Sequence, residues 1–124
     1  MSENREKVML IDDNEDIITV IKAMLEMKGY HVFINMEVDG IENSIKEISP
    51  DLIIMDMLLS GFDGSKICKS LKENSHFAPI PILMISAHPD AKEECLQAGA
   101  NMFLGKPFDM KDFYQAIEKS LLMR

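Results

Sequence analysis

Five short apolar runs recur along the chain, and they constrain its fold more than any other feature. They occupy residues 7–12, 31–36, 51–56, 81–87 and 102–106. Their centres, such as VMLI at 8–11 and LIIM at 52–55, are hydrophobic at every position instead of at alternate ones. A strand that is apolar on both sides is covered on both faces of its sheet, which is typical of parallel sheets. We therefore expect these runs to form a buried parallel sheet.

The segments that follow the runs have the spacing of amphipathic helices. In the first segment, apolar residues recur at intervals of three and four, namely Ile17, Val20, Ile21, Met24 and Leu25. Asn14 is placed to cap this helix, and Gly29 is placed to end it. The first segment therefore predicts a helix with one continuous apolar face.

Four further helices are expected from the same pattern. The second helix is marked by Ile41, Ile45 and Ile48 and must end before Pro50, and the third is marked by Ile67, Cys68 and Leu71. The fourth runs from about 90 to 98. The fifth runs from about 109 through Phe113, Ala116, Ile117 and Leu121. Strands and helices thus alternate, and right-handed crossovers then give a flavodoxin-like doubly wound α/β fold, (βα)5. We expect a five-stranded parallel sheet in the order 2-1-3-4-5.

Composition narrows the class of protein. With 124 residues, 47% hydrophobic and 27% charged, the chain is expected to form a single domain over 1–124, without an output domain. The net charge of −8 disfavours binding to nucleic acid or anionic lipid. No apolar run reaches the roughly 20 residues of a membrane span, so we expect a cytoplasmic protein. Cys68 and Cys95 lack metal-ligand spacing and are expected to be reduced and buried.

Polar residues stand where the apolar runs end. Asp12 and Asp13 finish the first strand, Asp56 ends the third, Ser86 lies near the end of the fourth, and Lys106 ends the fifth. In a doubly wound sheet these ends meet at one edge, near the switch point between the first and third strands. We therefore expect these side chains to converge.

Such a group of residues suits phosphate chemistry. Clustered carboxylates repel one another and require a compensating cation, and hard oxygen ligands favour Mg²⁺. A carboxylate is also a nucleophile that can take up a phosphoryl group, and Asp56, which the flexible Gly61 and Gly64 follow, is the best placed. Lys106 and the Ser86 hydroxyl would then neutralise the phosphoryl oxygens. Each residue alone is more often a turn, a cap or a surface residue, but together they indicate a functional site.

The motifs resemble those of response-regulator receiver domains of the single-domain chemotaxis-regulator type. The resemblance rests on LIDDN at 10–14, DMLLSGFDG at 56–64, Ser86-Ala87, and the stretch from Gly99-Ala100 to Lys106-Pro107-Phe108. It covers essentially the whole chain. It implies a phosphorylatable receiver of a two-component phosphorelay, a regulatory domain that catalyses its own aspartyl phosphorylation and slow dephosphorylation.

The resemblance also assigns roles to single residues. Asp56 matches the phosphoacceptor and Lys106 the phosphate-binding lysine. Asp13, Asp56 and the backbone carbonyl of Leu58 match the Mg²⁺ ligands, with Asp12 acting through water; Mn²⁺ is an expected substitute. Ser86 and Phe103 match the pair of switch residues, which would alter the face formed by the fourth helix, fifth strand and fifth helix.

The resemblance implies partners as well. The phosphoryl donor would be a histidine kinase or a phosphotransfer protein, and the product would bind a downstream protein as a monomer or as a phosphorylation-dependent dimer. Two positions depart from the family. Ser60 replaces a common proline, so the loop after Asp56 is expected to be less rigid. Phe103 replaces the commoner tyrosine and lacks its hydroxyl.

Other functions remain open on the sequence. A phosphohydrolase with an aspartyl nucleophile typically carries a D-x-D motif at its first strand, whereas this chain has adjacent Asp12 and Asp13. A flavin-binding electron carrier would need a phosphate-binding loop after the first strand. An interaction domain that works without phosphorylation is the hardest alternative to exclude. The chain is either a stand-alone regulator or a domain of a longer protein.

Overall fold

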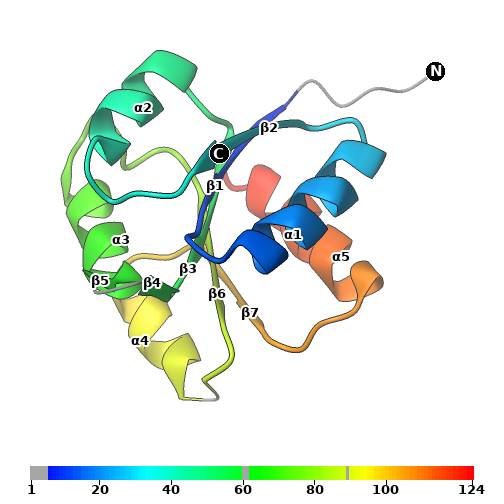
Figure 1. Ribbon diagram of the computed structural model, residues 1–124. Coiled ribbons are helices and arrows are strands. Elements are labelled where there is room, and N and C mark those ends of the chain that lie inside the picture. Colours follow the sequence, from blue (N-terminus) through cyan, green and yellow to red (C-terminus); the bar gives the residue numbers. More distant parts are fainter. Residues whose placement is uncertain (1–5, 60–61, 89) are drawn as a thin grey trace.

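The computed structural model describes residues 6–59, 62–88 and 90–124, in which a parallel sheet lies between two layers of helices (Figure 1). The sheet has the strand order β2-β1-β3-β6-β7. Its members are β1 (Lys7–Ile11), β2 (His31–Asn35), β3 (Leu52–Asp56), β6 (Ile82–Ser86) and β7 (Met102–Gly105). These strands are the five predicted runs, each shorter by one residue at one or both ends, so the predicted doubly wound fold in the order 2-1-3-4-5 is confirmed.

The five predicted helices are also present. They are α1 (Glu15–Met27), α2 (Ile41–Ile48), α3 (Gly64–Glu73), α4 (Ala91–Gln97) and α5 (Met110–Leu121). Figure 1 shows α1 and α5 on one face of the sheet and α2, α3 and α4 on the other. Within the described ranges, no helix has the length and apolar character needed to cross a lipid bilayer.

Short-range signals explain where the helices begin and end. The side chain of Asn14 accepts a hydrogen bond from the Ile17 amide at 3.1 Å, and Asp109 accepts one from the Asp112 amide at 2.8 Å. Both residues therefore act as N-caps, as predicted for Asn14. Beyond the end of α1, Gly29 has a left-handed φ of 84°, a conformation that favours glycine.

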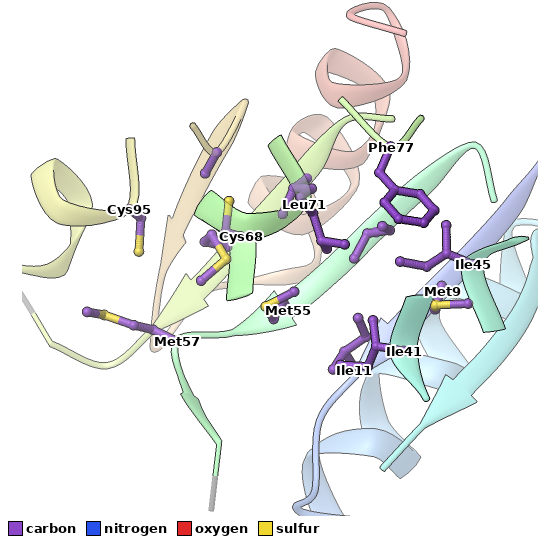
Figure 2. Close-up of a cluster of buried hydrophobic side chains, with 14 of the residues drawn as sticks. Met9, Ile11, Ile41, Ile45, Met55, Met57, Cys68, Leu71, Phe77 and Cys95 are labelled. Carbon is purple, nitrogen blue, oxygen red and sulfur yellow. The ribbon is translucent and has the colours of Figure 1, made fainter. Parts of the chain in front are cut away.

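Two apolar clusters fill the space between the layers. One lies between the sheet and α2, α3 and α4, and Figure 2 shows Met55, Met57, Cys68 and Cys95 among its side chains. The other lies on the α1 and α5 side and includes Phe113. Burial raises the pKa of both cysteine thiols to about 11, and both are free and buried, as expected.

The predicted apolar face of α1 is partly wrong. Val20 is 58% exposed, whereas Ile18, which the prediction left out, is buried with Ile21 and Leu25. Positions 18, 21 and 25 share the face that points to the sheet, and Val20 lies on its flank. The apolar stripe of α1 is thus wider than the surface that the sheet covers.

A small hairpin follows β3 that the sequence did not predict. Leu58–Leu59 (β4) pairs antiparallel with Phe62–Asp63 (β5), and α3 begins directly afterwards. Ser60 and Gly61, for which a flexible loop was expected, lie outside the described residues. Gly64 was expected to be flexible too, but it is buried and its amide donates to the Met57 carbonyl at 2.6 Å. Gly64 is fixed because the start of α3 packs against the end of β3.

Candidate phosphorylation site

The predicted site residues lie at the carboxyl edge of the sheet. Asp56 is the last residue of β3 and Ser86 the last of β6, while Asp12 and Lys106 directly follow β1 and β7. Because β1 has β2 on one side and β3 on the other, the chain changes direction between β1 and β3. A doubly wound sheet has its binding crevice at such a point.

Asp56 and Lys106 meet across this edge. The Lys106 ammonium lies 2.6 Å from an Asp56 carboxylate oxygen, although 50 residues separate them in the chain. The backbone around both residues is fixed, because the Met57 amide donates to the Ile85 carbonyl at 2.9 Å and the Lys106 amide to the Ser86 carbonyl at 2.8 Å. The Asp56 side chain is only 10% exposed, so this ion pair is shielded from water more than a surface pair.

Gly64 allows α3 to begin directly beside Asp56. A Cβ atom at Gly64 would collide with the Asp56 carbonyl oxygen and would lie 2.9 Å from the Met57 carbonyl oxygen. Only a residue without a side chain fits there. The sequence did not indicate this role, because the contact is made between backbones and depends on the tertiary packing.

Asp12 is a buried carboxyl that neighbours Asp56. Burial raises its pKa most strongly, and the charge of Asp56 raises it further, while the hydrogen bond from Asn14 and the charge of Lys106 lower it. That hydrogen bond runs from the Asn14 amide to an Asp12 carboxylate oxygen at 3.0 Å. The carboxyl groups of Asp12 and Asp56 therefore repel each other, and the Lys106 ammonium attracts both.

Asp13 and Leu58 are the other predicted metal ligands. Asp13 is half-buried in the connection between β1 and α1, and the backbone of Leu58 belongs to β4, where it pairs with Asp63. Among the residues that the structure describes, no three His, Cys, Asp or Glu side chains are grouped so that they could hold a metal ion. The predicted cluster of three carboxylates is therefore not present as a ready-made cage.

The donor set nevertheless fits Mg²⁺. This ion usually takes one or two carboxylates, keeps several waters and completes its shell with phosphate oxygens, so it does not need a closed protein cage. Burial and, to a smaller extent, the like charge of Asp56 raise the pKa of Asp12, and a cation would relieve the repulsion between the two carboxylates.

The two predicted switch residues sit on neighbouring strands. Ser86 is buried, and its hydroxyl oxygen accepts a hydrogen bond from the His88 amide at 3.0 Å. Phe103, in β7, is half-buried and packs against the core cluster beneath α2, α3 and α4. Between them, a Cβ atom at Gly105 would lie 3.7 Å from the Phe103 ring and 4.0 Å from the Ser86 carbonyl oxygen. Gly105 thus leaves space beside the ring.

Comparisons with known proteins agree with this geometry. The family described as the response regulator receiver domain matches residues 8–118. The chain is 33% identical over 122 residues to the DNA-binding dual master transcriptional regulator RpaA of Synechocystis, covering 95% of this chain and 49% of RpaA. The chain spans about half the length of the first curated relatives that it matches.

Solved structures give the same result. A putative response regulator from Chloroflexus aurantiacus has a TM-score of 0.90 and 29% identity, with 96% of this chain and 99% of the other covered. The receiver domain of the sensor histidine kinase PA1611 from Pseudomonas aeruginosa has a TM-score of 0.81 and 30% identity, with 95% and 98% covered. The latter was solved with a magnesium ion coordinated in its active-site cleft.

Proposed function

The chain belongs to the family of response regulator receiver domains, and we propose that its Asp56 accepts the phosphoryl group. The contact between the Lys106 ammonium and the Asp56 carboxylate, 2.6 Å long at the switch point of the sheet, carries this proposal. The donor would be a phosphohistidine of a histidine kinase or a phosphotransfer protein. As a receiver, the chain is a regulatory domain, and its own part in the transfer is to hold the reacting groups.

In the transfer, an Asp56 carboxylate oxygen forms a bond to phosphorus as the bond from phosphorus to the donor nitrogen breaks. The Lys106 ammonium, which already contacts this carboxylate, would bind one of the phosphoryl oxygens and offset its charge. The Ser86 hydroxyl would exchange its bond with the His88 amide for one to another phosphoryl oxygen. These roles require only positioning, which the backbone bonds at the strand ends supply.

Asp13, Asp56 and the Leu58 carbonyl would hold Mg²⁺, with Asp12 bound through water, and Mn²⁺ would be an alternative. The cation would offset the negative charge that gathers on the phosphoryl oxygens. The magnesium ion in the cleft of the PA1611 receiver domain supports this assignment. Calorimetry with Mg²⁺ should show binding to the wild-type chain and much weaker binding to Asp13→Ala; equal affinity would place the cation elsewhere.

A small phosphodonor tests the reaction without a kinase. Incubation with acetyl phosphate or phosphoramidate and Mg²⁺ should add the mass of one phosphoryl group, and hydroxylamine should remove it because an acyl phosphate is attacked by this nucleophile. Chelation of Mg²⁺ with EDTA should slow the addition strongly. No gain in mass under these conditions would contradict the proposal and favour an interaction domain that works without phosphorylation.

Phosphorylation should then change the surface formed by α4, β7 and α5. A dianionic group on Asp56 would draw the Ser86 hydroxyl inward, and the Phe103 ring would move into the space that the hydroxyl vacates, where Gly105 adds no side chain. A coupling of about 1–3 kcal/mol is enough to alter partner affinity several-fold to a hundredfold. Hydrogen exchange with and without beryllofluoride should change across residues 87–104; a change confined to the surroundings of Asp56 would contradict this switch.

A further inference from the structure

We propose that Asn35 is a positioning residue for Asp12, which it holds in place by tying the end of β2 to α2. The inference rests on the proposed function, because it concerns the carboxyl group expected to take part in cation binding. Asn35 itself is expected to touch neither the cation nor the phosphoryl group.

The first contact is between backbones. In the parallel pairing of β1 and β2, Ile11 lies opposite Asn35. The hydrogen bonding continues one residue beyond β1, because the Asp12 amide donates to the Asn35 carbonyl at 3.2 Å. The position of Asp12 therefore depends on where the last residue of β2 lies.

The side chain of Asn35 uses both ends of its amide group. Its nitrogen donates to the Glu37 carbonyl at 2.6 Å, and its oxygen accepts from the Ser44 hydroxyl at 3.2 Å. Ser44 lies in α2, nine residues further along the chain. One side chain thus joins the end of β2, the connection that follows it and the next helix.

This tether lies where the sheet offers least support. β2 is an edge strand of the sheet, so only β1 pairs with it. The connection to α2 ends at Gly40, which has a left-handed φ of 82° and gives α2 no side-chain cap. A strand end with a partner on one side and a glycine in the following connection is readily displaced, and the Asn35 amide restrains it.

Asp12 needs this restraint because its surroundings push it away. Its carboxyl group is buried, and it lies close to the like charge of the buried Asp56. Its carboxylate is held by the Asn14 amide on the α1 side, and its backbone by Asn35 on the β2 side. If the β2 side is released, repulsion from Asp56 can move Asp12 out of reach of the cation.

The test compares Asn35→Ala with Asn43→Ala, a matched change at an exposed asparagine of α2. In Asn35→Ala, we expect the affinity for Mg²⁺ alone to fall roughly tenfold, in the range known for residues that support metal ligands. The amide of Asp12 should also exchange its hydrogen faster. At saturating Mg²⁺, the rate of phosphorylation by acetyl phosphate should return close to the wild-type rate, because Asn35 supports binding and not the transfer itself.

A second pair of variants separates positioning from a general loss of stability. Ser44→Ala removes the anchor on α2 and should weaken Mg²⁺ binding in the same direction, whereas Ser44→Thr keeps the hydroxyl and should restore it. All variants are compared well below their unfolding temperatures. Should Asn35→Ala fold poorly, the Ser44 pair decides the question.

The outcomes separate this inference from the proposed function. Wild-type Mg²⁺ affinity and wild-type protection of the Asp12 amide in Asn35→Ala would overturn the inference and leave the proposed function intact. Failure of the wild-type chain to bind Mg²⁺ or accept a phosphoryl group would overturn the proposed function. In that case the exchange rate of the Asp12 amide still decides whether Asn35 holds Asp12.

Discussion

The two edges of the sheet hold charged residues in different ways. At the amino edge, Arg124 forms ion pairs with Glu6 at 3.2 Å and with Asp51 at 3.3 Å, and the Arg124 side chain is 43% exposed. At the carboxyl edge, Asp12 and Asp56 are buried side by side, and one lysine faces them. The opposite ends of the same strands thus carry exposed and buried charges.

The two edges differ in what their charges contribute to the stability of the fold. Exposed ion pairs stabilise a fold by only about 0–1 kcal/mol, but their charges keep most of their hydration. Buried charges lose their hydration, and two like charges also repel each other, so the carboxyl edge lowers the stability of the fold. A fold retains such an arrangement where it performs chemistry, and matched substitutions at the two edges test this view.

The largest difference should come from glycines at the two edges. Gly64→Ala would drive a methyl group into the backbone of Asp56 and Met57, which cannot move without disturbing β3. We expect a loss of about 3 kcal/mol in the free energy of unfolding, and loss of phosphorylation. Gly99→Ala, at the amino edge, meets side-chain carbons of Lys72 instead of backbone and must adopt a φ of 104°, so a smaller loss of about 1–2 kcal/mol is expected.

Urea unfolding measures both changes. Equal losses in the two variants would show that the start of α3 does not pack against Asp56 as tightly as the structure indicates.

The next comparison removes one cation from each edge. Lys106→Ala should slow phosphorylation of Asp56 by about a hundredfold, because a cation that offsets charge on the transferred group has an effect of this order. Arg124→Ala should leave that rate unchanged and alter the free energy of unfolding by about 0.5 kcal/mol or less. Rates with acetyl phosphate and Mg²⁺ check both, and equal rates in the two variants would remove Lys106 from the reaction.

A pH series separates the carboxyl groups. The pKa of Asp12 is raised from 3.8, first by burial and then by Asp56, so above pH 3.8 the folded protein binds this proton more tightly than the unfolded chain does. Stability is therefore lost as pH rises from 3.8 through the raised pKa of the folded protein, and remains lower above it. Asp12→Asn should stabilise the metal-free protein at pH 7, and the gain should disappear below pH 3.8.

Asp51→Asn is the control at the amino edge, where an exposed carboxylate pairs with Arg124. Asp51→Asn should not raise the free energy of unfolding at pH 7. Urea unfolding in EDTA at pH 7 and below pH 3.8 measures the stability of both variants. If Asp51→Asn stabilised the protein as much as Asp12→Asn does, burial of Asp12 would not be the cause.

A small gain in stability is expected at Ser49, which follows α2 at the amino edge. Ser49 has a left-handed φ of 52°, a conformation that glycine adopts without steric cost. Ser49→Gly should stabilise the fold by about 0.5–1 kcal/mol and leave phosphorylation unchanged. Thermal unfolding checks this, and destabilisation would show that Ser49 is not strained.

Much of this molecule follows from short-range patterns in the sequence. The continuous apolar runs predicted the strands, and their alternation with helices predicted the strand order. The polar residues at the ends of the runs predicted that Lys106 and Asp56 converge, and their side chains lie 2.6 Å apart. Such features depend on burial on both faces of a sheet and on the geometry of parallel strands, which the periodicity of the sequence reveals.

The remaining features depend on contacts between distant backbones. The β4–β5 hairpin, the fit of Gly64 against Asp56 and the bond from the Asp12 amide to the Asn35 carbonyl involve backbone groups, which nearly every residue has. Their identity gives no signal in the sequence. The exposure of Val20 has a similar origin, because the width of an apolar stripe does not reveal how much of it the sheet covers.

The two ends of β3 allow the most direct test of the central claim, that Asp56 is the phosphoacceptor. Asp51 directly precedes this strand and Asp56 ends it, so Asp51→Asn and Asp56→Asn make the same chemical change at opposite edges. Both variants are incubated with acetyl phosphate and Mg²⁺, and their intact masses are measured. Asp51→Asn should gain one phosphoryl group as the wild-type chain does, and Asp56→Asn should gain none. A phosphoryl group retained by Asp56→Asn, or lost in Asp51→Asn alone, would contradict the claim.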